Sequence, residues 1–317
     1  MSTMKVSRRS ALIAAPALAG LAACSKVSEE GADFPDDDLR LIIQADPGGG
    51  SDLSSRALAT ELESILGVSV VPENMPGASG AIAMEYVGDQ PADGYTIGFC
   101  PVEIAMLNTT QNADVLPENY SFIGQIMNAP GVLSVAADSE HETLADFLEA
   151  AKAEALTVAN SGAGSIWEAA ALGINNELGT QFTPVPYDGG ATAVSAAASG
   201  EADAAVSGVG EALAQGDAVR VLGVMHDETL PDLPDVPTFL DAAGADIQYG
   251  GWGGIYTAAG LPDDVRSTLE SAVQEAVDSE AYQEFQKNSG NLVVHRDADE
   301  FATFVDEQFS EFQELLG

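Results

Sequence analysis

Two glycine-rich loops are the segments of this sequence best suited to bind a ligand. Gly48-Gly49-Gly50-Ser51-Asp52 separates a short apolar run from a helical pattern, and Ser161-Gly162-Ala163-Gly164-Ser165 repeats this arrangement later in the chain. Such loops leave backbone N–H groups free at a helix N-terminus, a natural place for a carboxylate or phosphate. If the loops face each other, their amides converge on one cleft. Two unrelated turns on opposite surfaces remain the alternative.

Charged side chains contribute little to these loops. Asp52 is expected to hold the shape of the first loop rather than to contact an anion. None of the basic residues after position 24 lies in a glycine-rich loop: Lys26, Arg40, Arg56, Lys152, Arg220, Arg266, Lys287 and Arg296. An anion would therefore be held by amides, by bridging water and by the hydroxyl groups of Ser51, Ser79, Ser161, Ser165 and Tyr187.

Residues for catalysis or for cofactor and metal binding lack the required spacing. A dinucleotide fingerprint would need glycine at Leu53, and no Gly-Lys-Ser/Thr or Gly-x-Ser-x-Gly segment occurs. His141-Glu142 has no second histidine four residues on, as a zinc helix requires. Cys100 ends a strand-like run and is expected to be a small buried hydrophobic residue. We therefore expect no enzyme activity, no cofactor and no metal site.

The elements that position the loops alternate between strand and helix. Short apolar runs at 39–45, 68–71 and 95–99 alternate with helical patterns at 53–65 and 81–87. A second series has strands at 156–159, 182–185, 203–207 and 219–224 and helices at 166–178 and 191–198. An extended run at 122–136, a helix at 144–153 and two C-terminal helices at 263–278 and 297–315 complete the pattern. This alternation predicts an α/β fold with a parallel sheet, and its two series predict two lobes.

Composition excludes whole classes of partner. The 317 residues are 46% hydrophobic, too apolar for a disordered chain. Fifty acidic residues against 11 basic ones give a formal net charge of −39, which repels nucleic acid and anionic lipid. The same charge slows the arrival of an anionic ligand, less so at high ionic strength.

The N-terminus has the pattern of an export signal. Basic residues from Lys5 to Arg9 precede an apolar stretch at 11–23 that ends in Leu21-Ala22-Ala23-Cys24, which resembles a bacterial lipobox. We therefore predict a lipoprotein signal peptide at 1–23, a lipid anchor on Cys24 and a flexible tether at 24–37. The predicted location is the outer face of the cytoplasmic membrane, or the periplasm. Ser7-Arg8-Arg9 leaves both the twin-arginine and the Sec routes open.

Six motifs, in order along residues 38–315, resemble one protein family. They are Pro47-Gly48-Gly49-Gly50-Ser51-Asp52 with Arg56, Val71-x-Glu73-Asn74-x-Pro76-Gly77-Ala78-x-Gly80, Asp93-Gly94-Tyr95-Thr96, Ser161-x-Ala163-Gly164-Ser165, Val185-Pro186-Tyr187-x-Gly189 and Leu233-Pro234-Asp235-Val236-Pro237-Thr238. Together they resemble the extracytoplasmic solute receptors of tripartite tricarboxylate transporters, the Bug receptor family.

This resemblance implies a two-lobed, periplasmic-binding-protein-like (type II) fold with a ligand cleft between the lobes. Such a receptor closes around a small organic carboxylate and delivers it to membrane permease subunits. Lobe one is expected at 38–133 plus 250–317 and lobe two at 134–249, with the hinge near Leu133 and Gly250. The implied ligand-binding residues are Pro47, Gly48, Gly49, Gly50, Asp52, Ser79, Glu103, Ser161, Ala163, Gly164, Ser165, Tyr187 and Ser207.

Three positions depart from the family pattern. Glu168 stands where a histidine is common, Met75 where an arginine is usual, and Ser207 near a frequent acid. Glu168 and Glu103 near the cleft disfavour a tricarboxylate, so a mono- or dicarboxylate, a zwitterion or a largely neutral ligand is favoured. A sensory partner that presents a ligand to a membrane kinase, and an exported enzyme, are the alternative functions.

Overall fold

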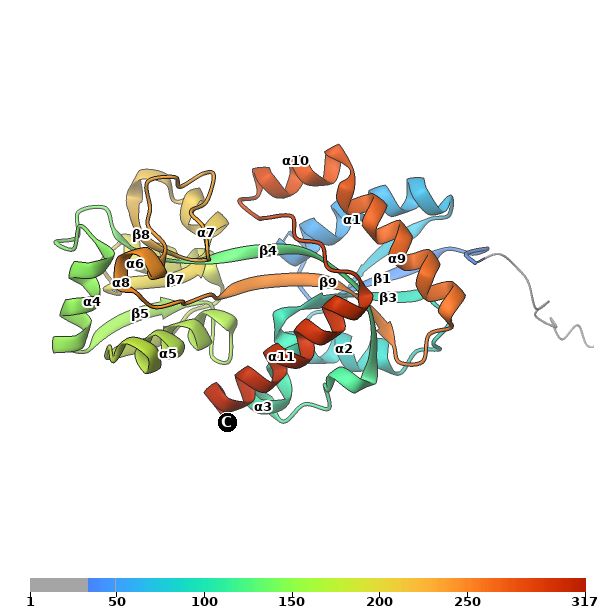
Figure 1. Cartoon of the computed structure of the whole chain (residues 1–317), viewed down its shortest axis with the longest axis horizontal. Coiled ribbons are helices and arrows are strands. Elements are labelled where there is room, and N and C mark those ends of the chain that lie inside the picture. The colour runs from blue at the N-terminus through green and yellow to red at the C-terminus, as the bar shows by residue number, and fades with distance from the viewer. Residues whose placement is uncertain (1–33, 49) are drawn as a thin grey trace, which may run out of the picture. The chain divides into compact units, whose positions relative to one another are not determined.

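A mixed nine-stranded sheet organises residues 34–48 and 50–317, the part of the chain that the computed structural model describes (Figure 1). Gly49 and residues 1–33, with the predicted signal peptide, Cys24 and most of the predicted tether, lie outside this part. The strand order is β2-β1-β3-β9-β4-β7-β5-β6, and β8 pairs with β4. Within the described residues no helix is both long and apolar enough to cross a membrane.

The first group of strands is parallel and is covered by helices on both faces. It consists of β1 (Leu39–Ile43), β2 (Val70–Asn74) and β3 (Thr96–Pro101). Leu41 and Ile43 of β1 pack with Leu58 of α1 (Gly50–Leu66), and Ile42 packs in the cluster that contains Met84 of α2 (Ala81–Gly88). Successive strand residues point to opposite faces, so the continuous apolar run of β1 reflects burial from both sides.

The second group repeats this arrangement. Its parallel strands are β5 (Leu156–Asn160), β6 (Phe182–Pro186) and β7 (Ala204–Gly208). Its helices and its remaining strand are α4 (Leu144–Ala153), α5 (Ile166–Leu178), α6 (Gly190–Ala198), α7 (Val209–Ala214), α8 (Phe239–Ala243) and β8 (Val219–Met225).

Two antiparallel strands run between these groups (Figure 1). The 17-residue β4 (Tyr120–Ala136) pairs with β9 (Gly250–Ala258) as far as Pro130, and from Gly131 it pairs with β7 and β8. All pairings of β4, and the pairing of β3 with β9, are antiparallel. The expectation of a parallel sheet is therefore correct for β1 to β3 and for β5 to β7, and wrong for β4, β8 and β9.

The remaining helices pack around the first group. They are α3 (Leu107–Gln111), α9 (Asp263–Asp278), α10 (Glu280–Asn288) and α11 (Ala298–Leu316). The predicted bounds of α5 and α9 agree with the structure, whereas β9 and α10 were not predicted. Cys100 is fully buried at the end of β3, as predicted, and burial raises the pKa of its thiol.

Candidate ligand-binding site

A cavity of about 560 Å³ lies among the loops at the ends of both strand groups. Its walls come from the loop after β1, the end of β3, the starts of α5 and α7, the middle of β4, the start of β9 and the end of α10. Three of the predicted ligand-binding residues line it: Gly48, Gly50 and Glu103. The carboxyl ends of parallel strands open into such crevices, which is where ligands bind in open α/β sheets.

Asp52 shapes the first glycine-rich loop. Its carboxylate accepts hydrogen bonds from the Gly48 N–H (2.8 Å), from Arg56 Nε (2.8 Å) and from Asn74 Nδ2 (2.8 Å). Burial by itself would raise the pKa of Asp52, but these hydrogen bonds together hold the pKa below its usual value. The prediction that Asp52 supports the loop is confirmed. The Ser51 hydroxyl accepts a hydrogen bond from Gln44, so its own proton is free to point at a ligand.

The second glycine-rich loop has the same kind of hydrogen bond, from a glycine N–H to the carboxylate four residues later. Glu168 accepts a hydrogen bond from the Gly164 N–H at 2.6 Å, and the Ser165 hydroxyl caps α5 by accepting one from the Glu168 N–H at 3.3 Å. A Cβ on Gly164 would lie 3.5 Å from Thr110 in α3, so the loop packs beside the first strand group. Ser161, Ala163, Gly164 and Ser165 do not line the cavity, whereas Ile166 and Trp167, which follow them, do.

A third helix, α7, also has an acid at its third residue, and this helix start was not identified from the sequence. Glu211 is the third residue of α7, and its carboxylate lies against Gly208 at the helix N-cap. A Cβ on Gly208 would lie 2.7 Å from Glu211 Oε2, and a Cβ on Gly190 would collide with the same carboxylate. Burial raises the pKa of Glu211 to about 7, and the neighbouring Gly208 backbone partly opposes this shift. The sequence signal for this helix start is the segment Gly208-Val209-Gly210-Glu211, in which glycines at the end of a strand are followed by an acid.

The other predicted residues make contacts of their own outside the cavity lining. The Ser79 hydroxyl accepts a hydrogen bond from Gln111 at 3.0 Å, and the Tyr187 hydroxyl donates one to Glu201 at 3.1 Å. Ser207 is fully buried and donates to the carbonyl of Gly208. Pro47 and Asp52 flank the lining residues of the first loop without joining them, and Gly49 lies outside the described residues.

Trp167 lines the cavity and packs against the sheet where β4, β7 and β9 are neighbours. It is 6% exposed, and its ring lies over glycines of three strands. An added Cβ would approach the ring to 3.0 Å at Gly131, 3.3 Å at Gly208 and 3.7 Å at Gly251. Glycine is needed at Gly131 and Gly208 because a side chain there would displace the indole.

The two strand groups touch through glycine backbone on one side of the cavity. A Cβ on Gly210 of α7 would lie 2.5 Å from the carbonyl oxygen of Ser289, and one on Gly290 would lie 3.1 Å from the Cα of Gly210. Ser289 and Gly290 follow α10, which belongs with the first group. Only a side chain no larger than hydrogen permits this approach.

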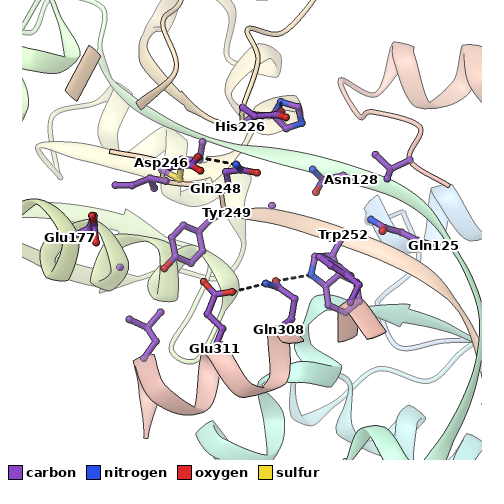
Figure 2. Close-up of a pocket in the computed structure, with 18 of the residues that line it drawn as sticks. Gln125, Asn128, Glu177, His226, Asp246, Gln248, Tyr249, Trp252, Gln308 and Glu311 are labelled. Carbon is purple, nitrogen blue, oxygen red and sulfur yellow. Dashed lines mark hydrogen bonds and ion pairs between the residues drawn. The ribbon is translucent and has the colours of Figure 1, made fainter. Parts of the chain in front are cut away.

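A second, larger cavity of about 740 Å³ lies between α5, α11 and the segment before β9 (Figure 2). Gln308 of α11 accepts a hydrogen bond from the Trp252 indole N–H and donates one to Glu311. The cavity contains none of the predicted ligand-binding residues. The smaller cavity is therefore the candidate ligand site, because the starts of α1, α5 and α7, each with an acid at its third residue, meet there.

Comparison with known proteins identifies the class of fold. The fold matches a TctC solute-binding protein from Polaromonas solved without ligand (TM-score 0.79, 25% identity, 89% of this chain and 98% of that chain). It also matches MatC from Rhodopseudomonas palustris with bound malate (TM-score 0.77, 24% identity, 90% and 100%). A UPF0065 protein of Bordetella pertussis (strain Tohama I) is 29% identical over 288 residues, 87% of this chain and 88% of that protein.

The fold is that of a solute-binding protein. Residues 54–316 match the family described as tripartite tricarboxylate transporter family receptor, and the chain belongs to that family. The family consists of substrate-binding receptors rather than enzymes, so the predicted family, fold class and receptor function are confirmed.

Proposed function

We propose that this receptor captures a small organic carboxylate in the 560 Å³ cavity and delivers it to the membrane permease subunits of a tripartite transporter. The single observation that carries the proposal is the convergence on this cavity of the loop after β1, the start of α5 and the start of α7. The malate bound by MatC supports a carboxylate as the ligand class. The free hydroxyl proton of Ser51, at the N-terminus of the 17-residue α1, is suited to one carboxylate end of the ligand.

Capture is proposed to work by closure of two lobes. Lobe one comprises residues 38–133 and 250–317, and lobe two comprises 134–249. The change of strand partner at Gly131 in β4, beside the start of β9, supports a hinge there. A ligand that contacts both lobes binds the closed form better and so increases its population.

Export and anchoring are part of the same proposal. Signal-peptide removal would leave Cys24 as the lipid-modified first residue and residues 24–37 as the tether. Such an anchor keeps the receptor at the outer face of the membrane, where the permease subunits are. Metabolic labelling with a palmitate analogue tests this, and a Cys24→Ala variant that still carries label would refute it.

A thermal-shift screen over organic acids at high salt tests the ligand class, because a ligand that binds only the folded protein raises the melting temperature. Acids that raise it are then titrated by calorimetry into the wild type, Gly49→Asp and Ser165→Ala. We expect both substitutions to weaken binding. Unchanged affinity in both variants would remove the two predicted loops from the site.

A further inference from the structure

The smaller cavity has an electrostatic character opposite to that of an anion site. Glu103, in the turn after β3, and Glu211, at the start of α7, both line it. The lining contains no lysine, arginine or histidine among the described residues. In that same part of the chain, neither glutamate forms an ion pair.

One backbone amide in each predicted loop is already engaged by an acid. The Gly48 N–H donates to Asp52 and the Gly164 N–H donates to Glu168, and the Glu211 carboxylate lies against Gly208. Each of the three helix starts therefore carries its own carboxylate at its third residue, which offsets the positive end of the helix dipole. A doubly charged anion would meet two glutamates without a compensating cation.

Burial adds a further constraint on the two glutamates. It raises the pKa of Glu103, although a hydrogen bond from that residue's own backbone partly opposes the shift, and it raises the pKa of Glu211 to about 7. A desolvated carboxylate without a partner is costly, and a cation placed beside it removes that cost.

Aromatic rings supply the second element of a cation site. Phe99, Trp167 and Phe285 line the same cavity as the two glutamates. The faces of aromatic rings attract ammonium groups, an interaction that strengthens when water is excluded. Carboxylates and aromatic faces together form a favourable setting for a positively charged nitrogen.

We propose that the ligand of this receptor is a zwitterion, an organic acid that also carries an ammonium group, and that Glu103 and Glu211 receive that ammonium group. This inference rests on the proposed function, since the cavity must bind a carboxylate-bearing solute. It adds that a dicarboxylate such as malate is a poor ligand for this chain.

The test compares ligands that differ only at one end. Hexanoate, adipate and 6-aminohexanoate form one set, and 4-methylbenzoate, terephthalate and 4-(aminomethyl)benzoate form a second. Each is titrated by calorimetry into the wild type, Glu103→Gln, Glu211→Gln and Glu177→Gln. Glu177 lines the larger cavity, so its variant controls for the loss of one negative charge elsewhere. Glutamine at position 211 keeps the size of the side chain beside Gly208 and removes its charge.

In at least one set we expect the amino acid to bind at least tenfold more tightly than both counterparts. Glu103→Gln and Glu211→Gln should each reduce that preference at least tenfold, and Glu177→Gln should preserve it. Tighter binding of adipate or terephthalate, or a preference that survives both variants at the cavity, would overturn the zwitterion proposal and leave the receptor function intact. If neither these six compounds nor any acid of the wider screen binds, carboxylate capture itself fails, and the zwitterion proposal with it.

Discussion

Replacing Gly210 by alanine tests whether the two strand groups must touch for a ligand to bind. The new Cβ would lie 2.5 Å from the carbonyl oxygen of Ser289, far inside ordinary contact, and its neighbour is backbone that no rotamer change can move. Overpacking of this kind costs about 1–3 kcal/mol. If Gly210 and Ser289 are in contact only in the closed receptor, the substitution raises the free energy of closure by this whole amount. The affinity for the ligand then drops by about 5- to 150-fold.

The stability of the ligand-free protein separates this effect from misfolding. Alanine has a higher helix propensity than glycine by about 1 kcal/mol, and Gly210 lies inside α7. We therefore expect the free energy of unfolding without ligand to stay constant or to rise slightly. Small-angle scattering at a ligand concentration that saturates only the wild type should show a larger radius of gyration for the variant.

The assay is calorimetric titration with the tightest acid from the screen, next to Gly88→Ala as a matched control. Gly88 also lies in a helix, and a Cβ there meets only the edge of the Tyr120 ring at 3.3 Å. The control should bind as the wild type does. An affinity of Gly210→Ala within twofold of the wild type would refute the idea that this glycine contact belongs to the ligand-bound form.

Three further perturbations have expected outcomes. Trp167→Ala should lower the free energy of unfolding by about 3–5 kcal/mol in urea denaturation, because it leaves a cavity where the buried indole packs against Gly251. A loss below about 1 kcal/mol would contradict this packing. Asp52→Asn should lower the free energy of unfolding by about 1–3 kcal/mol at pH 7, because the Gly48 N–H and Arg56 lose a charged acceptor. The difference from the wild type should shrink as the pH falls below the ordinary aspartate pKa, since the folded-state pKa of Asp52 is lowered. A pH-independent difference would refute the charge argument. The folded-state pKa of Glu211 lies above its unfolded value, so its contribution favours the fold below about pH 4.5 and is lost as the pH rises to about 7. Wild-type stability relative to Glu211→Gln should therefore fall by at most about 3 kcal/mol across this range in urea titrations, and a rise would show that the carboxylate is not desolvated.

Much of the fold was predictable because local patterns determine it. The continuous apolar runs of β1 and β3 and the helical spacing of α5 and α9 depend on residues near one another in the chain. Sequence pattern therefore located the two strands to within two residues and gave the bounds of the two helices. The segment Gly250-Gly251-Trp252-Gly253-Gly254 has no such pattern. It forms β9 because β3 and β4 flank it and because Phe99, Trp167 and Phe301 fill the space that side chains would take. Those contacts join residues far apart in the sequence.

By itself, the sequence established the α/β class, the family, the burial of Cys100 and the role of Asp52, since each depends on a local motif or on composition. The tertiary structure decided which loops share a cavity and where their hydrogen bonds go. It placed Glu211 beside Gly190 and Gly208, and it turned the Tyr187 hydroxyl toward Glu201. The sequence does not show that a loop amide is already hydrogen-bonded, because the acid that accepts from it reaches the loop only in the folded helix. The sign of the charge that the cavity prefers is therefore a property of the folded chain.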